Sequence, residues 1–128
     1  MSDTYPKRPV YLNLLRIRLP VGGVVSILHR ITGVLLVLLI PVFLFVLQYS
    51  LANNEAYVRV AASIGSTGGR VAALILLIML AHHLLAGVRH LLFDVDIGIG
   101  RIAARRSAWL VLVVMAILAI VSGGCLLL

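Results

Sequence analysis

The chain has 128 residues, of which 62% are hydrophobic and only 12% are charged, and its mean hydropathy is +1.17. Soluble domains are about half apolar and about a quarter charged, so this composition excludes a soluble enzyme and indicates an integral membrane protein. The net charge of +7 does not indicate a nucleic-acid interface, because the basic residues flank apolar segments and act as topology signals. The single cysteine, Cys125, excludes a disulfide framework and a cysteine-based metal motif.

The first twenty residues are polar and basic, with leucine and isoleucine alternating with arginine at positions 15–19. This alternation predicts a strip on the membrane surface, with its arginines at anionic headgroups. The alternative for the first ten residues is a disordered basic tail. No cleavable signal peptide is expected, because no small-residue cleavage site follows a short apolar core. We therefore expect residues 1–20 to form a cytoplasmic segment and residues 21–128 a membrane domain.

Three apolar stretches follow, at about 21–52, 70–93 and 107–128. Each has the roughly 20 residues that a helix needs to cross the hydrocarbon core. Polar connections, at 53–69 and 94–106, separate them. The N-terminal segment and the 94–106 loop carry most of the lysines and arginines, which places both in the cytoplasm and the C-terminus outside. The predicted fold is an all-α membrane protein with three transmembrane helices, up-down-up.

The second stretch ends in a cluster of ionisable residues. His83, Gly87, His90 and Asp94 share one helical face, because residues three, four and seven apart lie above one another. Ionisable groups at membrane depth are expensive and by default mark a functional site or a buried partner. Gly87 would leave a gap in this stripe where a bulky group can approach.

Two residues beside the stripe carry weaker expectations. His82 points about 100° away from His83 on a helix, and we expect it to face a partner helix or the interface. Asp94 is expected to begin the cytoplasmic loop and to pair with Arg89 or with a partner chain.

The first stretch opens with a second polar cluster, Ser26, His29 and Arg30. At 1.5 Å per residue His29 lies ~12 Å into the membrane and His83 lies ~9 Å from the same face. The first two spans are antiparallel neighbours, so these levels match. The sequence therefore predicts one site built from both clusters.

The residues by themselves leave the chemistry of this site open. A histidine in a helical bundle is a natural axial ligand of haem iron, and Arg30 and His29 suit its propionates. A second hypothesis is a proton path through His83, His90 and Asp94. A third is that these polar residues only form contacts that join helices. Zinc suits the set less well, because no cysteine or carboxylate accompanies His83.

The pair Ser26 and Arg30, one helical turn apart, also allows more than one reading. A hydroxyl and a guanidinium could hold a quinone carbonyl oxygen that gains negative charge on reduction. Alternatively, Arg30 reaches the headgroups and Ser26 bonds back to its own helix.

Two motifs resemble a known family. One is Arg8-Pro9 followed by Ser26-Ile27-Leu28-His29-Arg30 and Thr32-Gly33; the other is His83, Gly87, Arg89-His90 and Asp94 in that spacing. Together they resemble the cytochrome b membrane-anchor subunit of succinate dehydrogenase, respiratory complex II. The chain length and the three-span layout also match, so the resemblance covers nearly the whole chain.

This resemblance implies a function for individual residues. His83 would be the axial iron ligand of haem b, with His29 and Arg30 supporting the haem propionates. Ser26, Ile27 and Arg30 would form part of the site where the substrate quinone is reduced.

It also implies partners: a second membrane-anchor subunit that completes the helical bundle and donates the other axial histidine, an iron–sulfur subunit and a flavoprotein subunit. The chain would then lack any dicarboxylate or flavin site, and would lie in the inner (plasma) membrane. The alternatives are a fumarate reductase anchor, a small haem-free proton-path or transport subunit, and a purely structural anchor.

Overall fold

The computed structural model describes residues 19–127, and the chain there is almost entirely helical. The helices are α1 (Val21–Ser50), α2 (Asn54–Gly65), α3 (Thr67–Asp94) and α4 (Arg101–Leu127). Three of them, α1, α3 and α4, are long and apolar enough to cross a membrane. The 30 residues of α1 span ~45 Å, more than the ~30 Å of a hydrocarbon core. The predicted all-α architecture with three transmembrane helices is confirmed.

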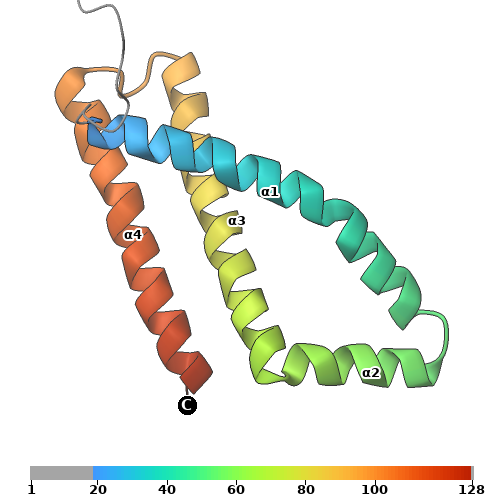
Figure 1. Ribbon diagram of the computed structural model, residues 1–128. Coiled ribbons are helices and arrows are strands. Elements are labelled where there is room, and N and C mark those ends of the chain that lie inside the picture. Colours follow the sequence, from blue (N-terminus) through green and yellow to red (C-terminus); the bar gives the residue numbers. More distant parts are fainter. Residues whose placement is uncertain (1–18, 128) are drawn as a thin grey trace, which may run out of the picture.

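The three long helices alternate in direction, as Figure 1 shows. The start of α1, the end of α3 and the start of α4 lie at one end of the molecule, which we call the arginine-rich end, because Arg89, Arg101, Arg105 and Arg106 lie there. From this end α1 crosses α3 and then diverges from it. Consequently α1 packs against α3 and α4 mainly through its first turns, and that is where the predicted site residues of α1 lie.

The connection at 53–69 is not the loop that its polar composition predicted. It forms α2, which bridges the distant ends of α1 and α3 (Figure 1). Asn53 caps this helix by accepting a hydrogen bond from the Ala56 amide at 2.8 Å, and Glu55 pairs with Arg59 at 2.9 Å one turn later. Local capping and an i,i+4 ion pair favour a helix even where the sequence is polar.

The buried core lies where α1, α3 and α4 meet, and it is small. Its fully buried members are Val25, Ala86 and Ala108, joined by Val111 and Met115 on α4. Two of these residues are alanines, and small side chains let membrane helices approach closely. Most other large apolar side chains are exposed, among them Val37 and Leu38 on α1. A chain that leaves this much apolar surface uncovered is suited to lipid and to further helices.

Candidate functional site

Three imidazoles meet between α1 and α3. The rings of His29 and His83 stack with their centroids 4.2 Å apart and their planes 12° from parallel. The ring of His90, two turns beyond His83, lies 5.2 Å from that of His29. The crossing of α1 over α3 near the arginine-rich end (Figure 1) therefore brings His29 to His83 and His90, as the sequence predicts for these three residues.

The orientation of His83 is set by two oxygen atoms of α1. Its Nδ1 lies 3.2 Å from the carbonyl oxygen of His29 and 3.4 Å from the hydroxyl oxygen of Thr32. The Thr32 hydroxyl lies 2.9 Å from two carbonyl oxygens of its own helix, those of Leu28 and His29, and donates to them. Both neighbours of Nδ1 thus act as acceptors, so Nδ1 carries the proton and the lone pair lies on Nε2. An imidazole held in this way presents one defined nitrogen to a ligand.

Glycines allow the two helices to come this close. A Cβ atom at Gly33 would lie 2.9 Å from Cε1 of His83, and one at Gly87 would lie 3.2 Å from Nε2 of His29. Gly87 was predicted to leave a gap for a bulky group. In this chain the gap is filled by the His29 ring from the neighbouring helix.

A shallow cleft of about 480 Å³ opens beside His83. Its polar lining comes from the two stacked histidines and Arg30, and the rest is the apolar face of α1 together with Gly33. The lining residues are His29, Arg30, Gly33, Val34, Val37, Leu38 and His83. An apolar wall with an imidazole inside it and a guanidinium at its edge combines the groups that a porphyrin with acidic side chains requires.

The donor set fits a haem better than a bare metal ion. Among the described residues 19–127, no three His, Cys, Asp or Glu side chains are placed to hold a metal ion, and the stacked rings of His29 and His83 do not converge on one point. Haem iron takes its equatorial ligands from the porphyrin and needs only axial ligands from protein. One oriented imidazole is therefore a sufficient contribution from this chain.

The other predicted site residues lie close by along α1. Ser26 is half-buried, and Ile27 and Arg30 are exposed, with Ile27 at 40%. Ser26 and Arg30 are one turn apart and share a side of the helix. Asp94, the last member of the α3 stripe, is exposed at the end of the helix.

Arg89 does not pair with Asp94 among the described residues. It is 8% exposed and turns toward α4, where Nε donates to the Ser107 hydroxyl at 2.9 Å and Nη2 donates to the Ala104 carbonyl at 3.2 Å. Its guanidinium also lies 4.5 Å from the centre of the Phe93 ring. The pairing with Asp94 expected from the sequence is thus replaced by hydrogen bonds that join α3 to α4.

A second face of α3, which the sequence analysis did not single out, is buried. The buried residues of this helix are His82, Ala86 and Arg89, at spacings of four and three. His82 is 6% exposed, and its Nε2 has no hydrogen-bond partner within residues 19–127. The same spacing rule that selected His83, Gly87 and His90 applies one residue earlier. That signal could have identified the face of α3 that packs inside the chain.

Comparison with known proteins identifies the family of this chain. Residues 4–122 match the family described as the succinate dehydrogenase/fumarate reductase transmembrane subunit. The chain is 33% identical over 118 residues to a succinate dehydrogenase cytochrome b556 subunit of Coxiella burnetii, covering 91% of this chain and 94% of the relative. It is 28% identical to the subunit of that name from Rickettsia prowazekii, covering 88% and 87%. A succinate dehydrogenase cytochrome b560 subunit of Reclinomonas americana is 32% identical over 93 residues, 68% of this chain and 64% of the relative.

The matched region includes all the helices that carry the histidine cluster, and it extends along most of α4. The resemblance carried by the two sequence motifs is thereby confirmed over nearly the whole chain. This multi-pass membrane protein belongs to the succinate dehydrogenase/fumarate reductase transmembrane subunit family.

Proposed function

We propose that this chain is the haem- and quinone-binding anchor subunit of a succinate:quinone oxidoreductase. Its relatives are named as cytochrome b subunits of succinate dehydrogenase, and a b-type cytochrome carries haem b. The chain would hold no dicarboxylate or flavin site. It would work beside a second membrane-anchor subunit, an iron–sulfur subunit and a flavoprotein subunit in the inner (plasma) membrane.

The observation that supports the haem assignment is the fixed orientation of the His83 imidazole. Two acceptor oxygens on α1 keep its proton on Nδ1, which leaves Nε2 as the ligand nitrogen. A hydrogen bond from the non-ligating nitrogen is the usual support of a metal-bound histidine. The haem would supply a one-electron redox centre. The second axial ligand would come from the partner anchor, because His29 is stacked on His83 rather than placed opposite it.

The haem propionates would be neutralised at the edge of the cleft. His29 and Arg30 lie in its lining, and cationic or N–H donors form strong, short hydrogen bonds with carboxylates. The apolar remainder of the lining, Val34, Val37 and Leu38, would cover the porphyrin face or edge and exclude water.

The quinone would bind toward the arginine-rich end, at Ser26, Ile27 and Arg30. A quinone carbonyl oxygen becomes negatively charged as electrons arrive, and a hydroxyl and a guanidinium already in place stabilise that charge without reorganisation. Ile27 would supply an apolar contact for the quinone ring, since its side chain is 40% exposed next to Ser26. Arg30 would thus interact with both the haem propionates and the quinone.

The orientation in the membrane follows from the cations. The arginine-rich end holds Arg101, Arg105 and Arg106 with the start of α1, whereas α2 at the other end carries Arg59 already paired with Glu55. The positive-inside rule places the arginine-rich end, the N-terminus and the quinone site on the cytoplasmic side, and the C-terminus outside.

The test is a reduced-minus-oxidised visible spectrum of the purified complex, taken for His83→Ala and for wild type. Loss or a large change of the b-type band is expected for His83→Ala. An unchanged band in His83→Ala would show that His83 is not the haem iron ligand. A wild-type complex with no b-type band would favour the haem-free proton-path subunit instead.

The quinone assignment has a separate test. Arg30→Ala should depress succinate–quinone reductase activity, while succinate oxidation with an artificial acceptor continues. Equal loss of both activities would contradict a quinone role. Faster fumarate reduction by the wild-type complex than succinate oxidation, with the quinone that co-purifies, would make the chain a fumarate reductase anchor.

A further inference from the structure

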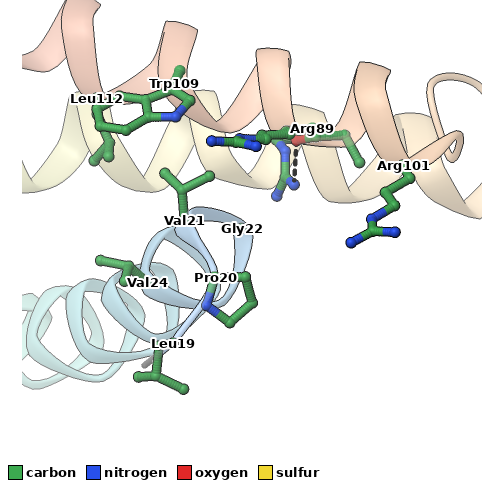
Figure 2. Close-up of a pocket in the computed structure, with 11 residues that line it drawn as sticks. Leu19, Pro20, Val21, Gly22, Val24, Arg89, Arg101, Trp109 and Leu112 are labelled. Atoms are coloured by element: carbon green, nitrogen blue, oxygen red, sulfur yellow. Dashed lines mark hydrogen bonds between the residues drawn. The ribbon is translucent and has the colours of Figure 1, made fainter. Parts of the chain in front are cut away.

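A cavity lies where the first turn of α1 faces α3 and the beginning of α4 (Figure 2). Its volume is about 740 Å³. None of its lining residues lines the cleft beside His83. We infer that this cavity binds the headgroup of an anionic phospholipid in the cytoplasmic leaflet, a role that goes beyond haem and quinone binding.

Among residues 19–127, three cations and no acidic residue line the cavity. Arg89 is buried and held by Ser107 and Ala104, so it contributes a fixed positive charge. Arg101 and Arg105 are exposed, and their guanidinium groups remain available to a ligand. Within residues 19–127 the only ion pair joins Arg59 to Glu55, so these three charges have no carboxylate partner there. Guanidinium groups bind phosphate through paired N–H donors.

The first turn of α1 adds to the positive electrostatic potential of the cavity. Pro20 stands at the N-cap, where it offers no side-chain hydrogen bond, and the first turn contains no acidic residue. The positive end of the helix dipole therefore lacks a counter-charge from its own turn. The guanidinium of Arg89 approaches the same turn, since a Cβ at Gly22 would lie 3.3 Å from its Nη2. Figure 2 shows Arg89 and this turn facing each other.

The remaining lining is apolar, which favours a lipid over a free anion. Val21 and Val24 on α1 face Trp109 and Leu112 on α4, as Figure 2 shows. Trp109 is 52% exposed, and tryptophan prefers the level of the headgroups in a membrane protein. A phospholipid would place its phosphate near the arginines and its acyl chains along the apolar residues. Anionic lipids are attracted to juxtamembrane basic residues on the cytoplasmic side.

The complex that contains this chain is purified in neutral detergent and titrated with dioleoyl-phosphatidylglycerol or dioleoyl-phosphatidylcholine, and bound lipid is counted by native mass spectrometry. Wild type should retain phosphatidylglycerol in preference to phosphatidylcholine. Arg101→Gln combined with Arg105→Gln should lower the affinity for one phosphatidylglycerol by roughly fivefold for each charge removed. Arg106→Gln is the matched control, because it removes a neighbouring charge that does not line the cavity. Equal loss in the control and the double variant would show unspecific surface attraction and overturn the proposal, as would full retention by the double variant.

A second measurement needs no charge variant. In vesicles, phosphatidylglycerol brominated in its acyl chains should quench Trp109 more strongly than brominated phosphatidylcholine at equal mole fraction, with Trp109→Phe providing the background from other subunits. Equal quenching by both lipids, or displacement of phosphatidylglycerol by inorganic phosphate, would overturn the proposal. Neither outcome depends on the haem spectrum.

Discussion

The hydroxyl oxygen of Thr32 on α1 lies 3.4 Å from Nδ1 of His83 on α3. The hydroxyl proton is directed to the carbonyl oxygens of Leu28 and His29, so Thr32 can only accept from the imidazole. A residue of the first span thereby orients the proposed haem ligand in the second span. The geometry of the histidine cluster therefore depends on the packing of α1 against α3.

Replacing Thr32 with valine keeps the shape of the side chain and removes the acceptor. An acceptor at Nδ1 makes the imidazole a stronger donor to iron and favours the oxidised state. The midpoint potential of haem b should therefore rise, by up to ~40 mV if one net hydrogen bond of about 1 kcal/mol is lost for a one-electron couple. Thr32→Ser, which restores an acceptor, should return the potential toward wild type. A potentiometric titration of the purified complex measures both, and equal shifts in the two variants would contradict the role.

Gly33→Ala should disturb the site while leaving the helix intact. The new Cβ would lie 2.9 Å from Cε1 of His83, so the imidazole or the helix must move. We expect a lower haem content per complex and a changed b-type band. Gly123→Ala on α4 is the control, because its Cβ would meet no atom within 4 Å and alanine in a helix is favoured over glycine by about 0.5–1 kcal/mol. Full haem content in Gly33→Ala would show that the close approach is not required.

Arg89→Ala should loosen α4 from α3. The substitution removes hydrogen bonds to Ser107 and Ala104 from a charged donor, and such a bond contributes about 1.5–3 kcal/mol. The thermal unfolding temperature of the complex should fall. Arg59→Ala breaks the exposed ion pair with Glu55. Such a pair contributes about 0–1 kcal/mol, so this variant should change the unfolding temperature little. Similar effects of the two variants would contradict the tether between the helices.

His82→Leu should stabilise the protein and leave its haem in place. The Nε2 atom of His82 is buried without a hydrogen-bond partner within residues 19–127, and an unsatisfied buried polar group costs about 1–3 kcal/mol. Thermal unfolding should shift upward, with the b-type band retained. His83→Leu is the matched variant, and there the band should be lost. Loss of the band in His82→Leu instead would exchange the roles of the two adjacent histidines.

The apolar stretches and their charged borders determined the membrane class, the three spans and the alternation of direction. These properties are local, because a helix in lipid must satisfy its own backbone hydrogen bonds and needs a fixed apolar length. The spacing of His83, Gly87 and His90, together with the depth of His29, also predicted which residues meet. Periodicity and rise along a helix depend on neither partner nor packing.

Only the tertiary structure decided which contacts each of these residues makes. The crossing of α1 over α3 placed Thr32 and the His29 carbonyl against His83, and filled the Gly87 gap with the His29 ring. The approach of α4 drew Arg89 away from Asp94 and into hydrogen bonds with Ser107 and Ala104. Capping by Asn53 and the need to bridge two diverging helices turned a polar connection into α2. Such outcomes depend on which helix faces meet, and that is set by packing between residues far apart in the chain.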